Sequence, residues 1–183
     1  MEQREQDREM LTLAAQLRAP LMRVAGLARS NCMGYVVFGV LTALFSLSTA
    51  AADLASMGVA AVLLFVGLRG RALAARLRDG DAEAARLLAR DELLLLGAIA
   101  IYCALMLTVI QPMGDDIDEA LKGSGISLDT ENLRRMIYVS VLAIAVLYQG
   151  GLAWRFRRIV PAAELYLAQV PEWARQAVAA LPG

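Results

Sequence analysis

Four long stretches of the chain are almost purely apolar. They cover roughly residues 33–52, 54–68, 93–112 and 136–153, and none has a charged residue in its interior. A surface helix of a soluble protein carries a polar stripe, whereas about 20 consecutive apolar residues are long enough to cross the hydrocarbon core of a bilayer. The pattern therefore predicts an all-α integral membrane four-helix bundle, built of two transmembrane hairpins with amphipathic N- and C-terminal helices.

The segments between the apolar stretches are short, so we expect a single membrane domain over residues 1–183. Four spans of about 20 residues leave about 100 residues, in separate pieces, for the ends and loops, and no soluble domain fits there. The predicted order is an amphipathic N-terminal helix (1–31), a first hairpin (32–68), a cytoplasmic helical hairpin (69–92), a third span (93–112), an acidic outer loop (113–135), a fourth span (136–154) and an interfacial tail (155–183).

Basic residues lie almost entirely on one side of the predicted spans. Residues 1–31 contain five, residues 69–92 six and residues 155–183 four, whereas residues 113–135 contain the other three of the eighteen. Loops rich in arginine and lysine stay on the cytoplasmic side, so both termini and the middle segment are expected there. Arginine greatly outnumbers lysine, and alanine and leucine are abundant, which is typical of GC-rich bacterial genes. The expected location is therefore the bacterial inner (cytoplasmic) membrane.

Both ends of the chain have amphipathic patterns. Between residues 3 and 29, apolar side chains recur at steps of four and three, namely Met10, Ala14, Leu17, Leu21, Val24 and Ala28. We favour a helix lying on the inner leaflet over a coiled-coil contact with another subunit, and we expect Pro20 to kink or interrupt it. In the tail, Pro161 and Pro171 are placed to begin two short helices that rest on the membrane.

The segment between the second and third spans is predicted to be a helical hairpin. Asp79-Gly80-Asp81 forms its turn, because Gly80 can take a positive φ and Asp81 can cap the helix 82–90, which feeds into the third span. The cytoplasmic topology and contact with anionic lipid head groups are sufficient to explain the arginines of this hairpin. Docking of an acidic protein partner or a nucleotide is the alternative, but no Gly-rich phosphate loop supports a nucleotide.

Two sets of residues are assigned to contacts within the membrane and at its surface. Small side chains at helical spacing let a neighbouring helix approach closely, and the helix-packing candidates are Gly39, Ala43, Ala100, Ala104 and Thr108. Aromatic and basic side chains hold a helix end at the inner interface, and the candidates for this anchor are Trp154, Arg155, Arg157 and Arg158.

The outer loop has the densest group of acids, formed by Asp115, Asp116, Asp118 and Glu119. Asp116-Ile117-Asp118 resembles the metal-holding acid pair of sugar-transfer enzymes, and Asp115-Asp116 with Glu119 resembles the acid motif of prenyl-transfer enzymes. Neither is accompanied by a second acidic motif or a basic phosphate clamp. The run also fails as a calcium loop, because Leu121 stands where glycine is required. We interpret it as a solvated loop that attracts cations, and assign no metal site.

Several function classes lose support from the composition. The chain has no histidine, the commonest general base, and its two cysteines are expected at different depths, unable to form a zinc site or a disulfide. No charged residue lies inside the predicted spans, where proton and ion relays need one. Zero formal net charge gives no nucleic-acid signature. We find no catalytic residues and expect no cofactor.

The remaining features favour a non-enzymatic, multi-pass inner-membrane protein that acts through homo- or hetero-oligomeric assembly. Its expected partners are membrane lipid and either itself or another membrane protein. The first alternative is an oligomeric small-cation channel with an acidic outer mouth. The second is a lipid- or sugar-modifying membrane enzyme that uses the outer acids.

Overall fold

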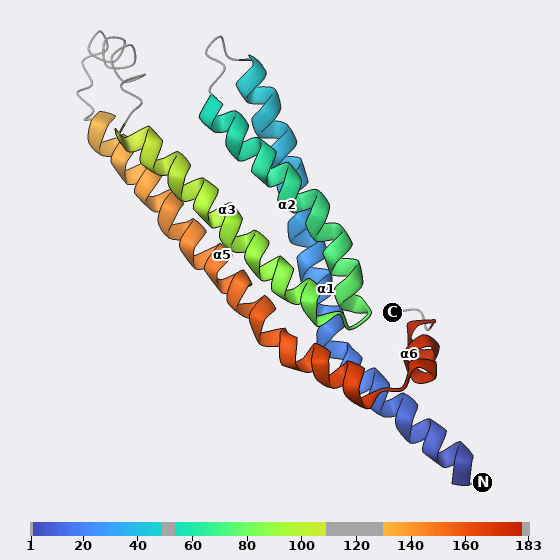
Figure 1. Cartoon of the computed structure of the whole chain (residues 1–183). Helices are drawn as coiled ribbons and strands as arrows, with labels where there is room; N and C mark the ends of the chain where they lie inside the picture. The colour runs from blue at the N-terminus through green and yellow to red at the C-terminus, as the bar shows by residue number, and fades with distance from the viewer. Residues whose placement is uncertain (1, 49–53, 109–129, 181–183) are drawn as a thin grey trace.

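The computed structural model describes residues 2–48, 54–108 and 130–180, and these form helices without any strand (Figure 1). The helices are α1 (Glu2–Ser48), α2 (Leu54–Arg78), α3 (Ala82–Thr108), α5 (Thr130–Gln169) and α6 (Glu172–Ala179). Four of them, α1, α2, α3 and α5, are long and apolar enough to cross a membrane. The predicted all-α fold with four such helices is confirmed.

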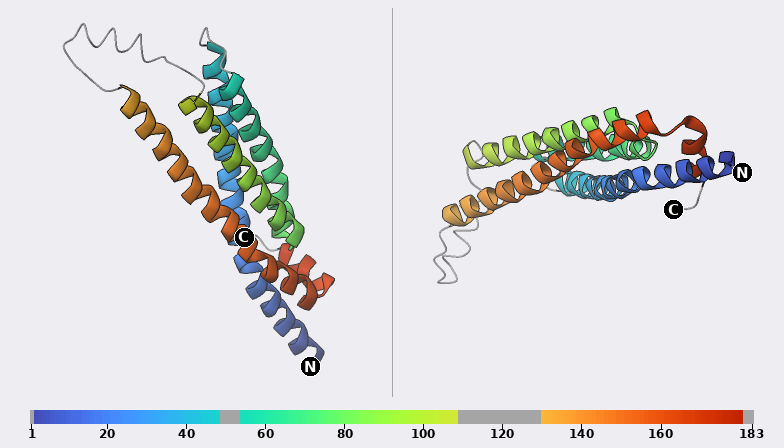
Figure 2. Two further views of the ribbon diagram at one scale, coloured as in Figure 1. Left: turned by 60° about the vertical axis from the view of Figure 1, so that its left-hand side comes forward. Right: turned by 90° about the horizontal axis from the view of Figure 1, so that it is seen from below.

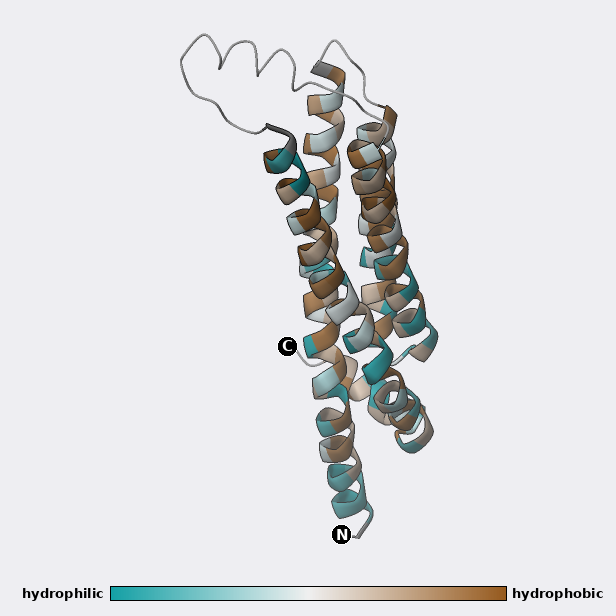
Figure 3. Ribbon diagram, turned by 90° about the vertical axis from the view of Figure 1, so that its left-hand side faces the viewer, coloured by the Kyte–Doolittle hydropathy of each residue, from teal (hydrophilic) through white to brown (hydrophobic). Residues whose placement is uncertain are grey.

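Two of the helices are much longer than a bilayer requires. With 47 residues in α1 and 40 in α5, a rise of 1.5 Å per residue gives lengths of about 70 Å and about 60 Å, against about 30 Å of hydrocarbon. Figure 3 shows the matching change in hydropathy, because apolar residues predominate along the upper part of the bundle, apart from the hydrophilic first turns of α5, and hydrophilic residues become frequent towards the N-terminus. We call residues 33–48, 54–68, 93–108 and 136–153 the apolar half. Residues 2–32, 69–92 and 154–180 are the basic half.

The bundle consists of two helical hairpins that meet in the basic half. Helix α1 packs along α2, and α3 packs along α5, while the turn between α2 and α3 joins the two pairs. The pairs draw apart towards the far end of the apolar half (Figure 1). In the other direction, the N-terminal part of α1 extends past the bundle, with α6 beside it (Figure 2).

Glycines bring α1 and α2 into close contact. A Cβ atom on Gly39 would lie 2.9 Å from Leu64 Cγ, and one on Gly67 would lie 2.9 Å from the carbonyl oxygen of Cys32. At Gly70 it would collide with the Cys32 sulfur. The backbones therefore approach more closely than any side chain would allow. Gly39, assigned to helix packing from the sequence, lies inside this contact within the chain.

The turn between α2 and α3 has the features that its sequence predicts. Gly80 has a φ of +91°, and Asp81 Oδ1 accepts hydrogen bonds from the backbone N–H groups of Glu83 (2.9 Å) and Ala84 (3.2 Å). The side chain of Arg76 also donates to Asp81 Oδ2, at 2.8 Å from its Nε. Helix α3 then runs without a break from this cap into the apolar half, as expected.

The two ends of the chain differ from the expectation in how their helices continue. Helix α1 passes through Pro20 and α5 passes through Pro161, so neither proline interrupts its helix. A proline inside a helix costs about 3 kcal/mol, and burial of neighbouring side chains such as Leu21 and Ala163, both fully buried, offsets it. Among the described helices only α6 is short, and Pro171 is its N-cap.

Most of the buried core lies in the basic half. Side chains from all five helices form one cluster there, which includes Leu21, Leu77, Leu88, Phe156 and Val178. The apolar positions of the N-terminal segment therefore pack against protein, whereas we favoured a lipid surface for them. In the apolar half the described buried cluster is small, with Tyr35, Val66 and Leu95 at its centre.

Candidate functional site

Buried polar side chains gather where the apolar and basic halves meet. The Tyr35 hydroxyl lies 2.8 Å from Glu92 Oε2 and 2.9 Å from Gln149 Oε1, so it joins α1, α3 and α5. All three side chains are buried, Glu92 with only 3% of its surface exposed. Arg69 and Asp91 lie beside them and form an ion pair at 3.2 Å. We call these five residues the buried polar cluster.

Each member of the cluster occupies a position in the buried stripe of its helix. Tyr35 follows Cys32 by three residues, and Glu92 lies between Leu88 and Leu95 at steps of four and three, all of them buried. Residues three and four apart share one face of a helix, so these polar groups point where apolar side chains would point. The spacing of these residues along their helices therefore places the polar groups inside the protein.

The Tyr35 hydroxyl has one proton but two oxygen neighbours. It can donate to Glu92 or to Gln149, and it can accept one hydrogen bond at the same time. Both contacts are satisfied together only if Glu92 carries a proton or if the Gln149 amide turns its NH₂ group towards Tyr35. The cluster can therefore hold one exchangeable proton among three helices.

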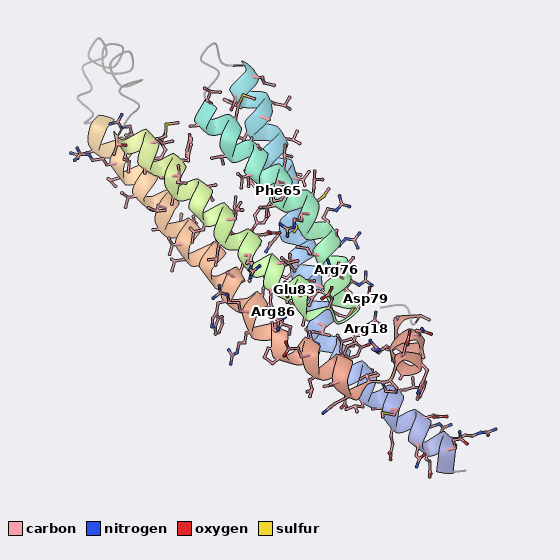
Figure 4. The ribbon with its side chains drawn as sticks, viewed as in Figure 1. Arg18, Phe65, Arg76, Asp79, Glu83 and Arg86 are labelled. Carbon is pink, nitrogen blue, oxygen red and sulfur yellow. The ribbon has the colours of Figure 1, made fainter. Side chains whose placement is uncertain are left out.

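The Asp91 carboxylate is buried but only half satisfied. Its Oδ1 atom pairs with Arg69, whereas its Oδ2 atom is buried and has no hydrogen-bond partner among the described residues. The Arg69 guanidinium also lies 5.7 Å from the centre of the Phe65 ring, which is labelled in Figure 4. A buried carboxylate with an unpaired oxygen is costly, so this position has a strong electrostatic preference for a proton or a cation.

A second contact between α1 and α5 lies next to the cluster. The Tyr148 hydroxyl donates to Asn31 Oδ1 at 2.9 Å. Each of these two residues directly precedes a buried position of its helix, and the Tyr148 side chain is half exposed. The α1–α5 contact is therefore polar at two successive positions, Asn31–Tyr148 and Tyr35–Gln149.

Asp81, in the turn between α2 and α3, is the other strongly hydrogen-bonded carboxylate. Partial burial favours its neutral form, but hydrogen bonds from the Arg76 side chain and from the Ala84 and Glu83 backbones outweigh that effect and lower its pKa. The cap is therefore ionised at neutral pH and holds the turn that joins the two hairpins.

The residues assigned to function from the sequence are spread over the molecule. Asp115, Asp116, Asp118 and Glu119 lie outside the described residues. Ala100 is half-buried on α3, while Ala104 and Thr108 are exposed, and the Thr108 hydroxyl bonds back to the Ala104 carbonyl oxygen at 2.7 Å. Among the anchor residues, the Arg158 guanidinium stacks 5.0 Å from the centre of the Trp154 ring. Arg155 and Arg157 are exposed on the same helix.

Sequence reasoning missed the buried polar cluster. Asp91 and Glu92 directly precede the apolar run that begins at Leu93, so the sequence pattern assigns them to the cytoplasmic hairpin and predicts no ionisable group among the spans. The signal that could have found Glu92 is its spacing from Leu88 and Leu95, which puts it on the apolar face. In the described part of the chain, no three histidine, cysteine or acidic side chains come together as a metal site requires.

The fold and the cluster define a helical protein with four helices able to span a membrane and a buried polar centre. No family model, no curated protein and no solved structure matches the chain.

Proposed function

We propose that this chain is a non-enzymatic multi-pass protein of the bacterial inner membrane, with both termini in the cytoplasm, that acts by assembling with itself or with another membrane protein. The observation that supports the proposal is a small-residue face on α3 that the described chain covers only in part. Gly97, Ala100, Ala104 and Thr108 follow one another at helical spacing. Ala104 and Thr108 are exposed, and nothing lies within 4 Å of a Cβ atom built on Gly97.

This face differs from the rest of the surface of the apolar half. Large side chains such as Phe38, Ile144 and Leu147 point outward elsewhere, as contact with lipid tails requires. Between large neighbours such as Ile101, the small residues leave a shallow strip on which another helix can pack closely. A glycine in a helix costs about 1 kcal/mol relative to alanine, and no close approach within the described chain requires glycine at position 97, because a Cβ atom there would meet nothing within 4 Å.

The orientation rests on the arginines. The basic half contains fifteen of the eighteen basic residues, and segments rich in arginine stay in the cytoplasm. This orientation puts the N-terminal part of α1, the α2–α3 turn and α6 inside the cell.

The test is the mass of the gently extracted protein and the effect of filling the α3 face. We expect the wild type to leave native membranes as a complex larger than one chain of 19.7 kDa. Ala104→Phe should shift it to a single chain, because the larger ring prevents close approach. Ile144→Phe, at a position 65% exposed on α5, is the matched control and should leave the complex intact. A wild-type protein that is a bare monomer, or an unchanged complex in Ala104→Phe, would refute the proposal.

A second candidate function is favoured by the buried carboxylates. An ionisable side chain buried among membrane helices commonly belongs to a proton or ion path, and Asp91 and Glu92 meet that description. In this reading an oligomer conducts small cations, with Asp115, Asp116, Asp118 and Glu119 concentrating them at the outer mouth. Glu92→Gln should abolish flux into liposomes and Asp116→Asn should reduce it, whereas Glu164→Gln on the exposed surface of α5 should not.

A further inference from the structure

Three arginines from separate elements line one cavity at the end of the basic half. The cavity has a volume of about 220 Å³ and lies between α1, the α2–α3 turn, α5 and α6. Its main polar lining consists of Arg18, Arg78, Asp79, Tyr166, Glu172 and Arg175. Figure 4 shows Arg18 and Asp79 where these elements converge.

Arg18 is the most deeply placed of the three. Only 9% of its surface is exposed, and its Nη1 atom donates to the carbonyl oxygen of Val178 at 2.6 Å, at the C-terminal turn of α6. This bond fixes α6 against α1, but a carbonyl does not neutralise a full positive charge. Within the described residues, no carboxylate forms an ion pair with Arg18.

The other arginines of the cavity are also without an ion pair among the described residues. Neither Arg78 nor Arg175 has a carboxylate of the described residues within 4.0 Å, although Asp79 and Glu172 line the same cavity. The Nε atom of Arg175 is buried and has no hydrogen-bond partner in the described part of the chain. Of the three guanidinium groups, Arg18 is buried, Arg175 half-buried and Arg78 exposed. With two carboxylates in the described lining, they leave a net positive charge around the cavity, and a buried guanidinium group needs a counter-charge.

The walls of the cavity are held in place before any ligand binds. Gly80 in the turn lies against the Tyr166 ring, so closely that a Cβ atom there would be 2.7 Å from Tyr166 Cδ1. Ala174 and Val178 of α6 are buried in the main core. A preformed site loses little conformational entropy when it binds a ligand.

From this geometry we propose that the cavity binds a phosphate group. The planar guanidinium fork matches the oxygens of phosphate, and several forks around one site are typical of phosphate recognition. The volume is below the roughly 300–1,000 Å³ of drug-sized sites, so it suits inorganic phosphate or a single phosphate monoester. The site involves none of the residues of the α3 face, and its occupancy does not depend on the assembly proposed above.

The phosphate group has two sources, a soluble molecule or a lipid head group. Helix α2 continues ten residues beyond Leu68 before it ends at Arg78, which places the cavity about 15 Å beyond the apolar half. Head groups extend only about 5–8 Å beyond the hydrocarbon on each side, so a soluble phosphate is favoured.

The experiment uses the full chain in phosphatidylcholine nanodiscs, with Trp154→Phe so that Trp173 on α6 is the only tryptophan. Inorganic phosphate is titrated at constant ionic strength against chloride, and Trp173 fluorescence and Tm are recorded. We expect a saturable fluorescence change and a higher Tm with phosphate alone. Arg175→Gln should weaken binding about tenfold or more, the value of one charge-assisted hydrogen bond. Arg23→Gln, exposed on α1, is the matched control and should bind as the wild type does.

Arg18→Gln is not suitable because it also releases α6, so Arg78→Gln serves as the second variant. A parallel series in nanodiscs that contain phosphatidylglycerol identifies the source. If these discs alone produce the change, and Arg175→Gln and Arg78→Gln remove it, the bound phosphate belongs to a lipid. The proposal is overturned if neither phosphate nor anionic lipid gives a saturable response, or if both variants respond as strongly as the wild type.

Discussion

The apolar and basic halves use the same helices but are packed by different rules. In the basic half, Leu21, Leu77 and Phe156 are fully buried in one core. In the apolar half most large side chains point outward, and glycine contacts hold α1 against α2. Water drives apolar side chains together, whereas lipid tails are as apolar as leucine and give no such drive. Under the membrane arrangement proposed above, the difference follows from the change of surroundings along each continuous helix.

The largest expected effect distinguishes the two halves directly. Phe156→Ala removes a fully buried ring from the basic core and should lower the free energy of unfolding by about 3–5 kcal/mol. Phe38→Ala removes a ring of equal size that is 64% exposed on α1, and should cost less than about 1 kcal/mol. Denaturant unfolding in detergent measures both. Equal losses of unfolding free energy in the two variants would mean that burial stabilises both halves to the same extent.

The next effect concerns glycine packing in the apolar half. Gly67→Ala puts a Cβ atom 2.9 Å from the backbone oxygen of Cys32, so α1 and α2 must separate, at a cost of about 1–3 kcal/mol. Gly58→Ala meets nothing within 4 Å and should be neutral or stabilising by up to about 1 kcal/mol. Tm values of the two variants in the same detergent provide the comparison. If Gly67→Ala were harmless, close backbone approach would not hold this hairpin together.

A smaller effect is expected at the boundary between the halves. Tyr35→Phe removes the hydroxyl that Glu92 and Gln149 share and should destabilise the protein by about 1–2 kcal/mol, because buried polar groups lose their partner. Tyr148→Phe removes a single bond to Asn31 from a half-exposed ring and should cost less. Unfolding of the two variants under identical conditions tests this order. The reverse order would show that the buried polar cluster adds no stability.

The smallest effect is a pH dependence at the turn of the basic half. Because folding lowers the pKa of Asp81, its carboxylate stabilises the fold above its unfolded pKa of about 3.9, and this contribution is lost as pH falls through the folded value. Asp81→Asn keeps a good N-cap but not the charge. The Tm difference between wild type and Asp81→Asn should therefore shrink as pH is lowered below about 4. A difference that stays constant down to pH 2 would contradict this assignment.

The sequence predicted the elements well where a local signal is sufficient. Charge-free apolar runs marked four helices, and Gly80 with Asp81 marked the turn and cap found in the structure. Local signals failed where the prediction depends on whether lipid or protein covers a given face of a helix. The apolar stripe through Leu21 and Ala28 fits a lipid surface as well as a protein core, and only the position of α5 and α6 distinguishes the two.

The candidate site was harder to predict because hydropathy describes a segment and not a contact. Glu92 adjoins an apolar run, which favours a solvated helix end, yet it accepts a hydrogen bond from Tyr35, 57 residues before it in sequence, and Tyr35 in turn contacts Gln149, 57 residues after Glu92. The arginine cavity likewise combines Arg18 with α6, 160 residues away along the chain at Val178. Such pairs have no spacing that a linear pattern can reveal.

Helix α1 passes through both halves as one unbroken rod. Over its length of about 70 Å, a tilt of about 5° displaces one end by about 6 Å relative to the other. The fulcrum lies near Tyr35, where α1 is tied to α3 and α5. In the assembly proposed above, a partner that displaces the N-terminal part of α1 would therefore move the opposite end of the helix in the reverse direction.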